Sequence, residues 1–260
     1  MAEAEKNRLK QWIYQTNDPH LLERYYDTVY DEMTESERDR MERRLMTAFA
    51  MDAMVSRVES QRGDMLIDVP VFGVQRTGNR TVLVGVLPDE RNGVFAEETD
   101  DPLAIGWHQL FRSRGVNFSP EELSLFSEEY YPKCVMHELV QRVIPHTDVQ
   151  MVKLPPYDSA SKEERGKRDR SEYQEHRVQA VRDTVLEAVQ KWRSPVLLTV
   201  GGETVTVVGV DDGEILYVDE GPGSLAGETE MLDVERLLDD RSGALSNLIM
   251  IYMTEAVAAE

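Results

Sequence analysis

Apolar positions in the first 60 residues recur every three or four places, which is the spacing of one face of an α-helix. This stripe comprises Met41, Leu45, Met46, Phe49, Met54 and Val55. Thr34 and Ser36 precede the stripe, and both are residue types that cap helix N-termini. We therefore predict a helical N-terminal region over residues 1–60, whose Met-rich stripe forms a core or a docking surface for a partner.

Valine-rich runs replace the helical spacing after residue 61. MLIDVPVFGVQ and RTVLVGVLPD flank RTGN, a turn sequence, and predict a β-hairpin that NGVF continues. DPLAIGWHQLFRSRG predicts a short helix that ends near Gly115, and SPEELSLFSEEYY predicts a helix capped by Ser119 with Pro120 first. Residues 61–124 are thus expected to form a hairpin-containing region that packs on the rest of the chain.

The remaining residues, 125–260, combine helical and strand patterns. CVMHELVQRVI predicts an amphipathic helix closed by Pro145, and the polar residues 153–172 predict an exposed loop or linker. A valine stripe at helical spacing follows, made of Val178, Val181, Val185 and Val189. SPVLLTV, ETVTVVGV and EILYVDEG predict strands, LDVERLLDD predicts a helix, and LSNLIMIYM predicts a buried strand or short helix. The expected fold class is α+β with an antiparallel sheet.

The charge of the chain limits its partners. A formal net charge of −20 argues against direct nonspecific nucleic-acid binding, because phosphates require Lys and Arg, and it favours basic protein partners. No apolar run approaches the roughly 20 residues that a membrane helix needs, and the N-terminus lacks the apolar core of a secretory signal. We expect a cytoplasmic location and no membrane partner.

The chain has a single cysteine, Cys134, which opens CVMHELVQRVIP and precedes VLEAVQKWRSPVLLTV and ETVTVVGVDDGEILYVDEGPG. This order resembles the papain-like fold of the bacteriocin-leader-processing (double-glycine) peptidases, in which a Cys opens a helix and a later hairpin begins with His and closes with Asp or Asn. The resemblance covers roughly half the chain, residues 125–260. It implies that Cys134 matches the nucleophile and Asp219 the orienting residue, while Glu203, or Thr204 in the other register, occupies the His position.

These departures from the family pattern argue against catalysis. A carboxylate near a thiol raises the thiol pKa by like-charge repulsion, so Glu203 would weaken the nucleophile. Glu128 and Glu129 stand where the family places an amide that holds the oxyanion. The resemblance therefore implies a non-catalytic (pseudo-peptidase) binding, adaptor or structural component of a larger assembly.

Two other functions remain open. The first is an active cysteine peptidase that uses Cys134 with a base recruited from elsewhere, and the second is an unrelated α+β structural protein of a multi-subunit particle. The candidate bases are His20, His108, His137, His146 and His176. Cys134, His137 and His146 could supply three metal ligands, but Cys-x-x-His alone is a weak signal, so no metal or cofactor is expected.

Overall fold

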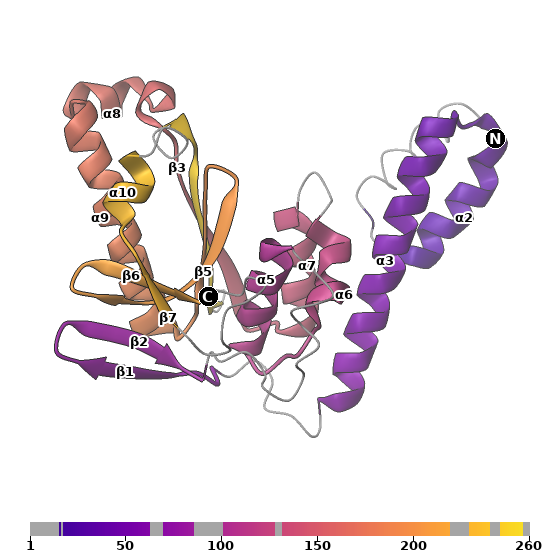
Figure 1. The fold of residues 1–260 in the computed structure, drawn as a ribbon. Helices are drawn as coiled ribbons and strands as arrows, with labels where there is room; N and C mark the ends of the chain where they lie inside the picture. The colour runs from indigo at the N-terminus through magenta and orange to yellow at the C-terminus, as the bar shows by residue number, and fades with distance from the viewer. Residues whose placement is uncertain are drawn as a thin grey trace. The chain divides into compact units, whose positions relative to one another are not determined.

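The computed structural model describes residues 16, 18–62, 70–85, 101–127, 132–218, 229–239 and 245–256 (Figure 1). The chain divides into two compact units, Met1–Gly63 and Asp64–Glu260. Each unit has its own set of elements, so the two are described separately.

The smaller unit is an antiparallel pair of helices, α2 (Pro19–Val29) and α3 (Glu35–Gln61), joined by the 3-10 turn η1 (Tyr30–Glu32). A capping box starts α3, because the Thr34 hydroxyl accepts from the Glu37 amide and the Glu37 carboxylate accepts from the Thr34 amide. The apolar contact between the helices comprises Leu22, Tyr25, Val29 and Ala48, with Met33, Met41 and Leu45 at its margin. The predicted helical region is thus present over residues 19–61.

Four members of the predicted stripe, Met46, Phe49, Met54 and Val55, lie outside this contact, and two of these are exposed. Met46 is 68% exposed and Phe49 39% exposed. Consecutive residues are rotated by about 100° around a helix, so Met46 lies beside the row formed by Leu45 and Ala48 and not in it. The ring of Phe49 instead makes an edge contact with His20 at the start of α2.

The larger unit is built on one antiparallel sheet. Its strands are β1 (Gly73–Thr77), β2 (Arg80–Val84), β3 (Thr147–Leu154), β4 (Val196–Val200), β5 (Glu203–Asp211), β6 (Glu214–Val218), β7 (Thr229–Leu232) and β8 (Leu248–Glu255). The strand order is β1-β2-β5-β4-β8-β3, and β6 and β7 extend the sheet from β5. This sheet and its helices confirm the α+β class.

The sheet includes elements from both regions that the sequence analysis separated at residue 124. The hairpin β1–β2 joins the sheet through β2, whose Thr81 and Val82 pair with Val210 and Gly209 of β5. The predicted turn lies at Gly78 and Asn79, where Gly78 has the positive φ of 61° that a tight hairpin turn requires. The apolar segment near the C-terminus is strand β8, which pairs on both sides, with β4 and with β3.

Helices cover both faces of the sheet (Figure 1). On one side lie α8 (Lys162–Lys167), α9 (Arg170–Glu187), its π-helical continuation η3 (Ala188–Trp192), and α10 (Val234–Asp239). On the other lie α5 (Pro102–Arg112), α6 (Pro120–Ser127) and α7 (Pro132–Val143). As predicted, Ser119 caps α6 by accepting from the Glu122 amide.

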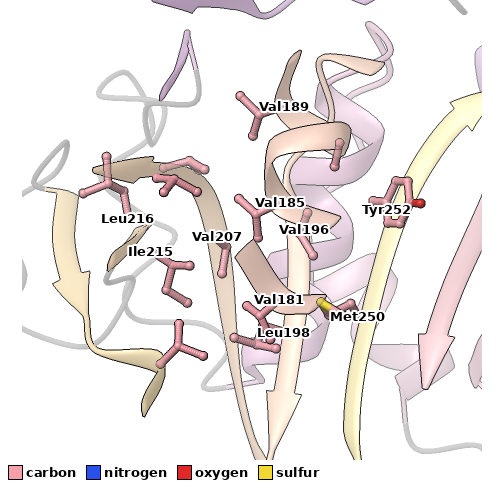
Figure 2. Packing of buried hydrophobic residues seen from close by; sticks show 14 of the residues in the cluster. Val181, Val185, Val189, Val196, Leu198, Val207, Ile215, Leu216, Met250 and Tyr252 are labelled. Carbon is pink, nitrogen blue, oxygen red and sulfur yellow. The ribbon is translucent and has the colours of Figure 1, made fainter. Parts of the chain in front are cut away.

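Side-chain alternation along β4 explains this sandwich. Val196 and Leu198 pack with Val181 and Val185 of α9 in the main apolar cluster (Figure 2). Leu197 points to the opposite face, where α5 approaches so closely at Gly106 that a Cβ there would overlap the Leu197 side chain. Successive strand residues point to opposite faces, so β4 is buried on both.

The prediction of a loop or linker over residues 153–172 is wrong. Strand β3 continues to Leu154, the 3-10 turn η2 (Tyr157–Ser159) follows, and α8 and the start of α9 occupy the rest. Ser161 with Glu164 and Asp169 with Glu172 form capping boxes that satisfy the free amides of these helices. Polar capping residues therefore start two helices in a segment whose composition suggested irregular structure.

Of two further segments, one was not predicted and the other is not described by the structure. Strand β7 was missed, because its residues follow a Gly-rich stretch that favours a turn. NGVF lies outside the described residues. Across the described part of the chain, no helix combines the length and apolar character needed to cross a membrane.

Candidate functional site

The hairpin β4–β5 carries the residue that the family resemblance compares with a catalytic His. Its two-residue turn consists of Gly201 and Gly202, with φ of 65° and 94°, and the pair Val200–Glu203 closes it. Both glycines have the positive φ of a type I′ turn. Glu203 is exposed as the first residue of β5. The hairpin therefore presents a carboxylate to solvent at the position where the family has an imidazole.

The next residue, Thr204, is fixed by the strand pairing. Its hydroxyl lies 2.9 Å from the hydroxyl of Thr199 on β4, and the two residues are directly opposite in the ladder. This cross-strand hydrogen bond gives Thr204 a structural role. The alternative register of the resemblance thus places a hydrogen-bonded threonine, and no base, at the hairpin start.

Helix α5 packs against one face of this hairpin, and α9 packs against the other. Helix α5 contacts both β4 and β5, and an added Cβ at Gly106 would lie 3.3 Å from the Thr206 hydroxyl of β5. The sequence of α5, PLAIGWHQLFR, contains no Cys, Ser or Thr. Because Cys134, on α7, is the only cysteine of the chain, neither α5 nor α9 carries a thiol.

Cys134 belongs to α7, which packs against α6 and the edge strand β3. Strands β8 and β4 lie between β3 and β5 in the sheet. With strands about 4.8 Å apart, β3 and β5 are separated by about 14 Å. The side chain of Cys134 and the whole of Asp219 lie outside the described residues, as do Glu128 and Glu129. The resemblance compares Cys134, Glu203 and Asp219 with a catalytic triad. Among these three, Glu203 is the residue whose side chain the structure describes.

His108, the histidine on α5, is buried and makes a hydrogen bond to the main chain. Its Nδ1 donates to the carbonyl oxygen of Phe118 at 2.5 Å. The Phe118 ring meets Phe111 edge-on with centroids 5.0 Å apart, next to the turn that follows α5. This bond holds the loop after α5 against the helix, so His108 does not offer Nδ1 to a substrate.

The other histidines occupy separate places. His20 is in the smaller unit, His176 lies beside Tyr173 on α9, and His146 is exposed in the turn before β3. Among the residues that the structure describes, no group of three or more His, Cys, Asp or Glu side chains is arranged to hold a metal ion.

One His–carboxylate pair does form, between α7 and β3. His137 Nδ1 lies 3.8 Å from Asp148 Oδ1, and the two side chains are 43% and 39% exposed. The Asp148 carboxylate also accepts from the amide of Val149 at 2.8 Å and from Gln150 Nε2 at 3.1 Å. Sequence reasoning missed Asp148, because only the fold-back of β3 onto α7 brings it to His137.

Two arginines are fully buried in structural positions. Arg114 Nη2 donates to the carbonyl oxygens of Trp192 and Met253, which ties the end of α5 to η3 and β8. Arg177 Nη2 donates to the Ser246 carbonyl oxygen at 2.8 Å, and burial lowers the pKa of its guanidinium. Both cations donate to main-chain carbonyl groups of the fold, so neither is evidence of a binding site.

Comparison of the chain with known proteins gives no family. No protein-family model matches it, and no curated protein or solved structure is significantly similar to it. The geometry described above is therefore the basis for any statement about function.

Proposed function

We propose that the protein is a non-catalytic papain-like module that acts by binding protein partners, as an adaptor or structural component of a larger assembly. The observation that carries this proposal is that neither helix packed on the Glu203 hairpin, α5 or α9, carries a thiol, and α5 also lacks a hydroxyl side chain. Nucleophilic catalysis requires the nucleophile and its base within hydrogen-bond reach of each other. The hairpin offers a carboxylate in place of the base, and neither helix that packs on it offers a cysteine nucleophile.

The charge distribution supports basic partners. Residues 64–260 contain 36 acidic and 19 basic side chains, a net formal charge of −17, whereas residues 1–63 carry −3. The excess of acidic residues is greatest from Glu203 onward, where the sequence contains 14 acidic and two basic residues. Such a surface attracts cationic partners and repels nucleic acid. We further propose a cytoplasmic location, where a lone cysteine remains reduced.

The first test measures whether Cys134 is an activated thiol. Alkylation by iodoacetamide is followed from pH 5 to 9 in the native protein, with EDTA present, and in the same protein unfolded in urea. We expect the native rate to stay at or below the unfolded rate at every pH, with a midpoint no lower than the ordinary thiol value of about 8.5. A native rate that exceeds the unfolded rate near pH 6 would overturn the non-catalytic proposal.

The same test evaluates the peptidase alternative. The pair His137–Asp148 favours this second candidate, because an imidazole beside a carboxylate is the usual partner of a catalytic thiol and His137 is three residues from Cys134 on α7. If Cys134 is activated by this pair, His137→Gln slows alkylation at pH 6 and His176→Gln does not. Equal rates in both variants would argue against this candidate.

The second test addresses binding. Charge reversal at three exposed acidic residues, Glu203→Lys, Asp233→Lys and Glu235→Lys, is compared with reversal at three exposed acids of the smaller unit, Glu23→Lys, Asp31→Lys and Glu35→Lys. We expect the first set to abolish association with a basic partner protein and the second to preserve it. Association should also disappear near 0.5 M salt, where the screening length is about 4 Å. Association unaffected by the first set would contradict an acidic docking surface.

A further inference from the structure

The outer edge of β1 is a sheet edge that the fold leaves open. Within the described part of the chain, β1 pairs with β2 alone, over five consecutive residue pairs that end at Thr77–Arg80. A two-residue hairpin turn is closed by a hydrogen-bonded pair, and hydrogen-bonded and non-hydrogen-bonded pairs alternate along an antiparallel ladder. Val74 and Arg76 therefore direct their amide and carbonyl groups away from β2, whereas those of Gln75 bond to it.

The other terminal strands of the sheet carry features that prevent pairing with a further chain. Strand β3 packs against α7, exposes Lys153 and runs into Pro155–Pro156. Strand β7 is only four residues long. A covering helix, lysine, proline and shortness are the usual means by which proteins block a sheet edge. Strand β1 contains no Lys or Pro, its register with β2 is free of bulges, and its residues 75–77 are exposed.

The charge of the hairpin determines what an added strand should carry. Residues 71–85 contain Arg76 and Arg80 but no Asp or Glu, in a unit whose net formal charge is −17. Arg80 has an acidic neighbour, because its Nη1 lies 3.8 Å from Asp211 Oδ2. Arg76 is exposed and makes no ion pair with a described residue. A carboxylate on a neighbouring strand would therefore supply Arg76 with a cross-strand partner.

The opposite end of β1 is apolar. Val84, which pairs with Gly73, is 41% exposed, and a Cβ at Gly73 would lie 2.9 Å from the Val84 Cγ2 methyl. This methyl thus takes the space that a side chain of β1 would fill. Val71, just before the strand, is 50% exposed. Glycine in a strand permits close approach of another backbone, so an added strand would contact apolar side chains at this end and the guanidinium of Arg76 at the other.

We propose that β1 binds an extended segment of a partner protein, which joins the sheet as a further antiparallel strand. The segment carries an acidic residue opposite Arg76 and a β-branched apolar residue two places later, opposite Val74. Each of these pairs exchanges two main-chain hydrogen bonds, which is the recognition mode of β-strand addition. A second copy of the chain is a poorer occupant, because its β1 brings no carboxylate to Arg76 and two units of net charge −17 repel each other. This surface is separate from the acidic surface proposed above, and it stands whether or not that proposal is correct.

The probe is the synthetic peptide acetyl-Thr-Glu-Thr-Val-Thr-amide, titrated into the full-length protein and followed by amide exchange in NMR spectra. In the free protein, the amides of Val74 and Arg76 should exchange rapidly, whereas that of Gln75 is already protected by its bond to β2. We expect saturable binding of one peptide per chain, with slower exchange at Val74 and Arg76 and no change at Gln75. Absence of saturable binding, or equal protection of all three amides in the free protein, would overturn the proposal.

Variants of Arg76 separate the main-chain and charge contributions. The Arg76 amide points outward, so Arg76→Pro should abolish peptide binding without removing a bond of the β1–β2 ladder. Arg76→Gln should weaken binding of the Glu peptide about threefold and leave binding of a peptide with Gln in place of Glu unchanged. Arg165→Gln, at an exposed cation of α8, is the matched control and should bind both peptides as the wild type does.

Two further measurements complete the test. Circular dichroism and the urea midpoint establish that each variant is folded, and Arg76→Gln tests the same edge if the proline variant is not. Equal weakening of both peptides by Arg76→Gln would refute an acidic residue opposite Arg76. Sedimentation of the protein without peptide tests the other occupant: a wild-type dimer that Arg76→Pro converts to a monomer would assign this edge to a second copy and overturn the proposal.

Discussion

The attachment of the β1–β2 hairpin to the sheet depends on the absence of a side chain at Gly209. Only two residue pairs join β2 to β5, and one of them is Val82–Gly209. A Cβ at Gly209 would lie 2.8 Å from the Cα of Val82 and still closer to the carbonyl oxygen of Thr81. Both obstacles are backbone atoms, so no side-chain rotation can relieve the overlap in Gly209→Ala.

The cost of Gly209→Ala can be estimated from this geometry. An ordinary contact needs about 3.4 Å or more, so β2 must move by roughly 1 Å. Overpacking of this kind costs about 1–3 kcal/mol, and each hydrogen bond lost from the ladder adds about 1 kcal/mol. We expect the free energy of unfolding to fall by about 2–4 kcal/mol. For a unit of this size, the corresponding decrease in Tm is about 5–15 °C.

Urea unfolding of the full chain, followed by circular dichroism, measures this change. Gly166→Ala is the matched control, because nothing lies within 4 Å of a Cβ at that position of α8. Alanine is the better helix former, so we expect this control to be neutral or to gain up to about 1 kcal/mol. Amide exchange in β2 should also become about 30-fold or more faster in Gly209→Ala, which is the factor that a loss of about 2 kcal/mol gives. If the two variants unfold within about 0.5 kcal/mol of each other, the close approach of β2 to β5 is refuted.

Three further substitutions test other contacts. Arg177→Ala removes a fully buried side chain and leaves the Ser246 carbonyl without its donor. We expect the free energy of unfolding in urea to fall by about 3 kcal/mol. A loss below about 1 kcal/mol would contradict a structural role for Arg177. The hydrogen bond to the Glu42 carboxylate raises the pKa of Tyr26 to about 12. This contribution to stability is present below about pH 10, the ordinary tyrosine pKa, and is lost as the pH rises through 12. In Glu42→Gln the phenol should titrate near pH 10 by ultraviolet absorbance, and an unchanged titration would exclude the carboxylate as the cause. Thr34→Ala removes one half of the capping box of α3 and should cost about 1 kcal/mol, seen as faster amide exchange in the first turn of that helix.

The sequence alone determined most of the local elements. The stripe from Val178 to Val189 is a buried helical face, Thr34 caps α3, and turns form at Gly78–Asn79 and at Asp212–Gly213. These features depend on residues within a few positions of one another, through side-chain spacing, capping hydrogen bonds and positive φ. Local prediction failed at residues 153–172 and at β7, where polar or Gly-rich composition obscured short elements, and it assigned no element to most of β3.

Only the tertiary structure decided which elements meet. The sequence predicted that Glu203 begins a strand, but it gave no means of knowing that α5 covers that strand while the Cys134 helix packs on β3. The insertion of β8 between β3 and β4 separates the two, and strand order is set by long-range burial that periodicity does not encode. The approach of Asp148 to His137 arises in the same way, from the packing of β3 against α7. Local patterns thus specified the elements, and the common sheet specified which side chains can act together.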